Sequence, residues 1–349
     1  MAELVNPKRR VLLGAAAIAA VCLDLDGVSD VQASSLGSSL RSENAARSSS
    51  ILGPYRQVAA GVLDVGYVEM GPANGPVVIL LHGFPYDLHS YVGVAPRLAA
   101  AGMRVIVPHL RGHGTTKFLE SAKGRSGEQA ALGADLVALM DALRIKSAIL
   151  AGYDWGGRAA CVVAALWPDR CRGLISVNSY LIQDIAKAGN PLPAKVEAGF
   201  WYQFYFTTER GRAGLTNSRN DIAHLMWLNN SPTWKFDEPT FARSALAFAN
   251  DAYVDVVIHS YRHRLGTEGG HPEYASLQSR LAAQPRITVP TITLDGDSDG
   301  VVAATDGKGQ AALFTRRTHR IVQGVGHNVP QEAPKVFADA VLDLLNETA

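Results

Sequence analysis

The stretch Gly152-Tyr153-Asp154-Trp155-Gly156-Gly157 joins a short apolar run to an Ala- and Val-rich helical pattern. It has the form of a tight strand-to-helix turn, Gly-x-nucleophile-x-Gly, with aspartate where serine usually stands. Such a turn lifts Asp154 above the sheet at a helix N-terminus, where backbone N–H groups favour negative charge. Because aspartate is already ionised at neutral pH, it can attack without a base to deprotonate it. An ordinary capped turn is the alternative interpretation.

On both sides of this turn the chain alternates strand and helix. Short β-branched and leucine runs, typical of strands buried on both faces, occupy residues 77–81, 104–108, 148–151, 173–177 and 290–294, with a weaker run at 319–322 and a hairpin at 56–60 and 63–70. Helical patterns fall at 88–101, 127–143, 157–166 and 334–345. We therefore predict the α/β class, with a mostly parallel eight-stranded sheet and helices on both faces.

One stretch interrupts this alternation. Residues 181–285 contain no hydrophobic strand, only helical and aromatic-rich sequence such as Trp201-Tyr202-Gln203-Phe204-Tyr205-Phe206. An insertion of this length is too long for a simple loop. We predict a helical lid inserted after strand 6, and a core formed by residues 54–180 and 286–349.

The first residues are typical of an export signal. Lys8-Arg9-Arg10 precede an apolar run at 11–23 that is too short to span a bilayer, and a small-residue cleavage site ends at Ala33. The pattern resembles a bacterial twin-arginine signal over 1–33, which predicts a periplasmic or secreted protein without stable membrane insertion after processing. Aspartates close to the cleavage site leave a membrane-anchored N-terminus as the alternative. The serine-rich segment 34–53 is predicted to be a tether.

Composition excludes several classes of function. The chain has 349 residues, 47% of them hydrophobic, and a formal net charge of +1, so it has no electrostatic footprint for nucleic acid or an anionic membrane. Its three cysteines, Cys22, Cys161 and Cys171, form neither a disulfide framework nor a spaced metal site. We expect Cys161 and Cys171 to be buried thiols, and we expect no metal and no cofactor.

A second turn complements Asp154. Leu81-His82-Gly83-Phe84-Pro85 ends an earlier strand. In turns of this kind the backbone N–H of Phe84, together with that of Trp155, forms an oxyanion hole. We expect His82 to hold the turn rather than to act in catalysis.

A candidate base and acid follow later strands. His327, in Gly326-His327-Asn328-Val329-Pro330, follows the last strand, and an imidazole can take a proton from water near neutral pH. Its partner is expected in Asp295-Gly296-Asp297-Ser298-Asp299-Gly300, where spacing alone allows Asp297 or Asp299. A calcium loop is disfavoured, because the glycine and glutamate of an EF-hand do not follow at the required spacing.

Taken together, the motifs His-Gly-Phe-Pro, Gly-Tyr-Asp-Trp-Gly-Gly, Gly-Asp-Ser-Asp-Gly and Gly-His-Asn-Val-Pro-Gln-Glu occur in the order and spacing of a known family. From about Tyr55 to the C-terminus the chain resembles the epoxide hydrolase and haloalkane dehalogenase branch of the α/β-hydrolases. The resemblance implies an aspartate nucleophile, and its usual Gly-x-x-Asp pattern favours Asp299 over Asp297 as the triad acid.

The lid resembles that of epoxide hydrolases more than that of dehalogenases. Tyr202 and Tyr261 match the segments that carry the two oxygen-polarising tyrosines, with Tyr205 as an alternative to Tyr202. Dehalogenases often have a polar residue in the place of Phe84. Phe84, Trp155 and Tyr205 are expected to line the substrate pocket.

The resemblance therefore implies a hydrolase that opens a small hydrophobic epoxide to a diol. Asp154 would form an ester while the tyrosines protonate the oxygen, and water activated by His327 would hydrolyse it. The alternatives are a haloalkane or haloacid dehalogenase and a non-catalytic, lidded small-molecule binding protein. Oligomeric state does not follow from the sequence.

Overall fold

The computed structural model describes residues 49–348 of the chain. The predicted export signal, residues 1–33, and most of the predicted tether lie outside the described residues. The end of the tether segment already belongs to the fold, because β1 (Ser49–Ser50) and β2 (Gly53–Pro54) pair antiparallel and Leu52 is buried in the core. The description below concerns the unit from residue 46 onward.

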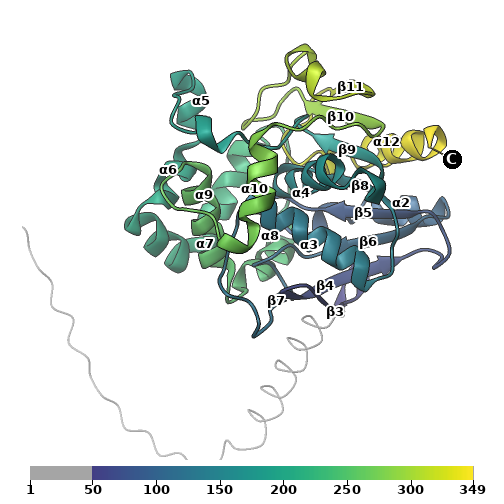
Figure 1. Ribbon diagram of the computed structural model, residues 1–349, viewed down its shortest axis with the longest axis horizontal. Coiled ribbons are helices and arrows are strands. Elements are labelled where there is room, and N and C mark those ends of the chain that lie inside the picture. Colours follow the sequence, from purple (N-terminus) through teal and green to yellow (C-terminus); the bar gives the residue numbers. More distant parts are fainter. Residues whose placement is uncertain (1–48, 349) are drawn as a thin grey trace, which may run out of the picture. The chain divides into compact units, whose positions relative to one another are not determined.

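The centre of this unit is one mixed sheet (Figure 1). Its strands are β3 (Arg56–Ala60), β4 (Leu63–Met70), β5 (Val77–Leu81), β6 (Arg104–Pro108), β8 (Ala148–Gly152), β9 (Cys171–Val177), β10 (Thr291–Gly296) and β11 (Arg317–Val322), with the short β7 (Lys117–Phe118) beside β4. The order is β11-β10-β9-β8-β5-β6-β4-β3. The strands from β11 to β6 in this order are parallel to one another. Strand β4 runs antiparallel to both of its neighbours, β6 and β3. The predicted mostly parallel sheet is confirmed.

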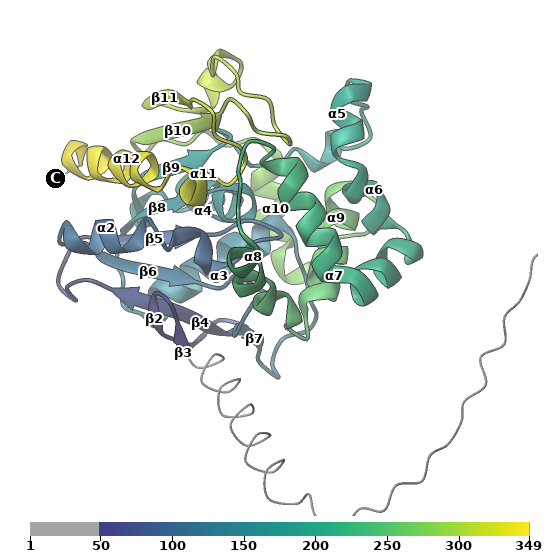
Figure 2. The ribbon, with the colours of Figure 1, turned by 180° about the vertical axis from the view of Figure 1, so that it is seen from behind.

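Helices cover both faces of the sheet. On one face, α3 (Gln129–Ala142) and α4 (Asp154–Leu166) pack together, and α4 contacts β8 and β9 (Figure 1). On the other face, seen in Figure 2, α2 (Ala95–Ala100) and α12 (Pro334–Glu347) pack against each other and the strands. Both layers follow from strands that are apolar on both sides.

One helix prediction was wrong in its extent. Residues 88–101 form a short 3-10 helix, η1 (Leu88–Tyr91), and a separate α2, rather than one continuous helix. Pro96 stands in the first turn of α2, where its missing N–H costs nothing, but it could not continue a helix from η1. Gly93 lies between them, in a place where a Cβ would come within 2.7 Å of Pro334 Cβ.

The insertion between β9 and β10 is helical. It contains α5 (Ala194–Gly199), α6 (Trp201–Thr207), α7 (Glu209–Asn230), α8 (Glu238–Ala245), α9 (Tyr253–Arg264) and α10 (Ala275–Ala282), with 3-10 turns η3 (Ile185–Lys187), η4 (Leu246–Ala249) and η5 (Pro272–Tyr274). Helices α6, α7 and α9 pack on one another to one side of the sheet (Figure 1). The last helix, α10, returns to pack on α3 and α4 of the core.

Three shorter elements complete the fold: η2 (Pro168–Arg170), η6 (Lys308–Leu313) and α11 (Val329–Glu332). Cys161 and Cys171 are buried and unpaired, as predicted. Among residues 49–348, no helix has the length and apolarity needed to cross a bilayer.

Candidate active site

Asp154 is the first residue of α4 and adopts a left-handed backbone conformation, with φ of +49°. A non-glycine residue held there is strained and is often functional. The two flanking glycines make the turn possible. A Cβ on Gly152 would come within 2.6 Å of the Gly156 carbonyl carbon, and a Cβ on Gly156 would collide with the Leu81 carbonyl oxygen. The predicted tight turn after β8 is therefore present.

Two groups hold the Asp154 carboxylate from different sides. The backbone N–H of Phe84 donates to Oδ1 at 2.7 Å. His327 Nε2 lies 3.8 Å from Oδ2, which is too long for a direct hydrogen bond but close enough for a strong charge interaction. Gly83 permits this approach, since a Cβ there would lie 2.8 Å from the Asp154 Cβ. The Trp155 N–H, in the first turn of α4, has no helical acceptor of its own.

His327 is paired with Asp299. Its Nδ1 lies 2.8 Å from Asp299 Oδ2, while Asp299 Oδ1 accepts the N–H groups of Val301 and Val302 at 2.7 and 3.0 Å. Asp297 does not reach the histidine, because its Oδ1 accepts the N–H of Gly324 at 2.6 Å. Of the two aspartates that spacing left open, the structure brings Asp299 to the site.

The two lid tyrosines lie together over this group. Tyr202 on α6 and Tyr261 on α9 are both buried, and their ring centroids are 5.5 Å apart at 88°. The Tyr261 ring lies 5.6 Å from the Phe84 ring and 6.1 Å from the Trp155 indole. Helices α6 and α9 therefore bring the two hydroxyl-bearing rings to the turns that follow β5 and β8.

Tyr205 is not part of this cluster. Its hydroxyl fills the space beside Gly214 of α7, where it would collide with an added Cβ, and its ring lies 6.0 Å from that of Trp201, tilted by 41°. The expectation that Tyr205 lines the pocket or replaces Tyr202 does not agree with this placement. Helical spacing alone does not separate the two residues; Tyr205 packs against α7, whereas Tyr202 packs against Tyr261 of α9. Phe84 and Trp155, the other two residues expected to line the pocket, stack on each other at 5.3 Å, and neither lines the cavity beside Arg158.

Comparison with known proteins identifies the family of this chain. Residues 76–334 match the family model described as "alpha/beta hydrolase fold". The chain belongs to the α/β-hydrolase fold family. A solved structure from Klebsiella pneumoniae subsp. pneumoniae MGH 78578, provisionally described as an epoxide hydrolase, is 50% identical with a TM-score of 0.81, covering 83% of this chain and 96% of its own. This places the chain in the epoxide hydrolase-like branch.

Two curated relatives are more distant. Epoxide hydrolase A of Mycobacterium tuberculosis (strain ATCC 25618 / H37Rv) is 26% identical over 304 residues, or 80% of this chain and 92% of that protein. The magnesium-chelatase 30 kDa subunit of Rhodobacter capsulatus is 29% identical over 300 residues, covering 84% of this chain and 96% of the subunit. The family therefore includes relatives with different names.

The charges of the site are strongly coupled in this hydrolase. Burial alone would raise the pKa of Asp154, but its interactions with His327, with smaller contributions from the Phe84 N–H and Arg264, bring that pKa below its usual value. Burial opposes protonation of His327, yet the charges of Asp299 and Asp154 raise its pKa to about 10. In the free enzyme His327 is thus an imidazolium between two carboxylates.

Both lid tyrosines carry their protons at neutral pH. Burial, reinforced by the Asp154 charge, raises the pKa of Tyr202 to about 12. Burial also raises the pKa of Tyr261 well above its usual value, and the nearby Tyr202 and Asp154 add to that effect. The two phenols are therefore hydrogen-bond donors in the vicinity of an ionised carboxylate.

His82 holds the turn after β5, as expected. Its Nε2 accepts the Leu110 N–H at 3.0 Å, so its Nδ1 donates to the Gly83 carbonyl at 2.9 Å. Burial, together with the nearby His113, keeps the pKa of His82 well below its usual value, so the ring is neutral. A neutral, doubly bonded imidazole fixes the backbone next to Phe84.

Several supporting residues were missed by the sequence analysis. Asn178 follows β9 and donates its side-chain N–H to Asp299 Oδ2 at 3.1 Å. The sequence contained a signal for Asn178, since a polar residue directly after a buried parallel strand lies at the ligand-binding edge of such sheets. The His327 loop is held by Ser231, at the end of α7, whose Oγ accepts the His327 N–H at 3.1 Å and donates to Glu332 Oε1 at 2.6 Å. No local sequence pattern predicts the contacts of Ser231 with the His327 loop, because the two segments are distant in the sequence.

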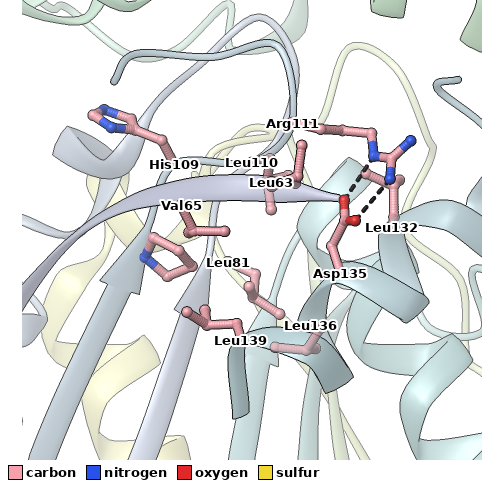
Figure 3. Close-up of a pocket in the computed structure, with 11 residues that line it drawn as sticks. Leu63, Val65, Leu81, His109, Leu110, Arg111, Leu132, Asp135, Leu136 and Leu139 are labelled. Carbon is pink, nitrogen blue, oxygen red and sulfur yellow. Dashed lines mark hydrogen bonds and ion pairs between the residues drawn. The ribbon is translucent and has the colours of Figure 1, made fainter. Parts of the chain in front are cut away.

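Two cavities differ in their relation to the site. One of about 380 Å³ is lined by α4, the segment after β9, α6 and the end of α9. The other, of about 20 Å³, lies among aliphatic side chains such as Leu63, Leu81 and Leu136, beside the two-point ion pair of Arg111 with Asp135 (Figure 3). It has room for about one water and is a packing void rather than a substrate pocket.

No group of histidine, cysteine and carboxylate side chains suited to a metal ion occurs within residues 49–348.

Proposed function

We propose that this hydrolase opens epoxides through an ester on Asp154. The observation that supports the proposal is the placement of one ionised carboxylate, in a strained turn, close to two protonated phenols from the lid. Opening an epoxide needs both a nucleophile and an acid, because the ring oxygen becomes an alkoxide unless an acid donates a proton to it as the ring carbon is attacked. A serine-type acyl-transfer site would need neither phenol.

In the first step Asp154 Oδ2 attacks the less hindered ring carbon. Its other oxygen, Oδ1, is already held by the Phe84 N–H. The carbon–oxygen bond of the ring breaks, and Tyr202 or Tyr261 gives its proton to the departing oxygen. The product of this step is a hydroxyalkyl ester, and Asp154 has lost its negative charge.

The loss of that charge prepares the second step. The Asp154 charge is one of the interactions that keep His327 protonated, so esterification lowers the histidine pKa, and the imidazolium can return a proton to the phenolate. The neutral ring, oriented by Asp299, then removes a proton from water as the water attacks the ester carbonyl. The oxyanion forms on Oδ1, where the N–H groups of Phe84 and Trp155 stabilise it. Collapse breaks the ester bond to the substrate oxygen, which takes the proton of the newly formed Asp154 carboxylic acid, so that the diol leaves and the carboxylate and the imidazolium remain.

A single turnover in heavy-oxygen water tests this scheme. Enzyme in excess over an epoxide should place the label in the Asp154 carboxylate and leave the first-turnover diol unlabelled, because water attacks the ester and not the epoxide. The His327→Gln variant should accumulate the ester, visible as a mass increase on the peptide that contains Asp154, and Asp154→Asn should not. Label that enters the diol directly, with an unlabelled aspartate, would rule out the ester.

One observation favours a second candidate, a dehalogenase. The indole N–H of Trp155 is buried and has no hydrogen-bond partner among the described residues, so it could donate to a departing halide. The second turn, however, contributes an apolar Phe84 side chain. Halide release from short alkyl halides, measured beside diol formation from epoxides of the same skeleton, separates the two reactions. Faster halide release would favour the dehalogenase.

A further inference from the structure

The larger cavity contains two arginines that have no acidic partner. Arg158, four residues after Asp154 on α4, and Arg264, three residues after Tyr261 on α9, both line it. Asp154 itself does not line the cavity. The guanidinium of Arg264, which lines the cavity, lies 5.2 Å from the centre of the Tyr261 ring, so the cavity adjoins the lid tyrosines and is suited to a part of the substrate remote from the epoxide ring.

Arg158 is a buried cation with unused donor capacity. Its side chain is 8% exposed, its Nη1 donates to the Leu181 carbonyl at 2.7 Å, and its buried Nε has no partner. Arg264 donates its Nε to Gln183 Oε1 at 2.9 Å, and its guanidinium lies 5.2 Å from the centre of the Tyr261 ring. Within residues 49–348, neither guanidinium has a carboxylate at ion-pair distance, unlike the buried Arg111 with its Asp135.

The lining of the cavity also contains one lysine and two carboxylates. Lys187 is paired with Asp184 at 2.8 Å, and Glu197 accepts the Leu192 N–H at 2.7 Å. Burial, together with the like charge of Arg264, lowers the pKa of Arg158 to about 9, so Arg158 still carries its charge at neutral pH. A buried charge with no carboxylate at ion-pair distance costs free energy that an anionic ligand would recover.

We propose that Arg158 and Arg264 bind the carboxylate of an anionic substrate, so that this hydrolase acts on epoxides of carboxylic acids. Planar guanidinium groups match carboxylate oxygens, and charge-assisted hydrogen bonds of this kind are strong. Arg158 is four positions after Asp154 on α4, a rise of about 6 Å, which suits a short aliphatic chain between the ring and the acid. Phe200, Phe204 and Leu181 line the cavity and provide apolar contacts for that chain.

The proposal rests on the proposed epoxide hydrolysis and can fail independently of it. The test compares kcat/KM for a terminal epoxide of a short-chain carboxylic acid with kcat/KM for the alcohol of the same skeleton. The wild-type enzyme should prefer the acid roughly 10- to 100-fold, the range of a charged hydrogen bond. Opening of both substrates at equal rates would overturn the carboxylate site and leave the proposed function intact. Absence of opening for any epoxide would instead count against the proposed function.

Variants assign the preference to the two arginines. Arg158→Met and Arg264→Met should each lower kcat/KM for the acid by roughly tenfold more than for the alcohol. Arg262→Met is the matched control, because Arg262 is on the same helix but pairs with Glu209 at 2.7 Å and does not line the cavity. It should leave the ratio of the two substrates unchanged. A ratio that changes equally in all three variants would overturn the assignment.

Inhibition of the wild-type enzyme keeps the proposal testable if Arg158→Met does not fold. A saturated carboxylic acid of the same chain length should inhibit competitively, at a concentration at least tenfold lower than the corresponding alcohol. Arg264→Met should reduce that difference. Equal inhibition by the acid and the alcohol would overturn the proposal.

Discussion

His327 Nδ1 lies 2.8 Å from Asp299 Oδ2, while the carboxylate of Asp297, two residues earlier, is turned to the Gly324 N–H. The first prediction follows from this difference. Asp299→Asn should slow ester hydrolysis on the order of a thousandfold, because the amide no longer stabilises the imidazolium or fixes the tautomer. Formation of the ester should continue, so that the ester accumulates, as measured by rapid quench and mass spectrometry.

Asp297→Asn is the matched control for that variant. It weakens one loop hydrogen bond at an exposed position and should change the rate of ester hydrolysis less than about fivefold. If Asp297→Asn accumulated the ester and Asp299→Asn did not, the pairing would be assigned to the wrong aspartate.

The coupled charges predict how stability depends on pH. Folding raises the pKa of His327 from 6.5 to about 10, so this histidine stabilises the fold fully below pH 6.5, and its contribution is lost as the pH rises toward 10. His327→Gln lacks this contribution. The melting temperature of the wild-type protein should therefore exceed that of the variant by several degrees near pH 6, and the difference should shrink by pH 10.

Differential scanning calorimetry of both proteins across that range makes the measurement. Other titrating groups, such as His89, are present in both proteins and cancel in the comparison. A difference that stays constant with pH, or grows toward pH 10, would show that His327 is neutral in the free enzyme.

The lid tyrosines predict an effect on the first step alone. Tyr202→Phe and Tyr261→Phe should each slow ester formation by roughly 10- to 100-fold, and the double variant should lose nearly all of it, since no acid remains for the epoxide oxygen. Stopped-flow or rapid-quench experiments resolve this step. Tyr205→Phe is the control, because its hydroxyl faces Gly214 of α7, and it should change the rate little. A loss in Tyr205→Phe equal to that in Tyr202→Phe would contradict the assignment.

Local patterns predicted the core well because each pattern corresponds to a physical requirement. β-branched runs predicted β5 and β6 to the residue, and the glycines around Asp154 predicted the turn that their close packing demands. Spacing could not decide whether Asp297 or Asp299 is the partner of His327, because the direction in which the loop turns determines which carboxylate reaches the histidine. The protonated state of His327 also escaped prediction, because it depends on two carboxylates brought together from distant parts of the chain.

The placement of the two cavity arginines could not be predicted from local patterns either. Arg158 follows the turn on a helix, where a single basic residue is usually an exposed one, and only the packing of α9 against the core places Arg264 beside it. Contacts between the lid and the core are set by side-chain packing over distances that a periodic pattern does not encode.

Asn178 provides the last prediction, since it combines a site contact with backbone strain. Its side-chain amide donates to Asp299 Oδ2, the oxygen that also faces His327, and its φ is +64°. Asn178→Ala and Asn178→Gly both remove the donor, so both should slow ester hydrolysis by about 3- to 10-fold while ester formation stays unchanged. They should differ in stability, because alanine is strained at this φ and glycine is not, by about 1 kcal/mol in favour of glycine. Equal ester hydrolysis in both variants together with unequal denaturation midpoints would separate the hydrogen bond from the strain. Wild-type hydrolysis in Asn178→Gly would show instead that Asp299 holds His327 without help from this amide.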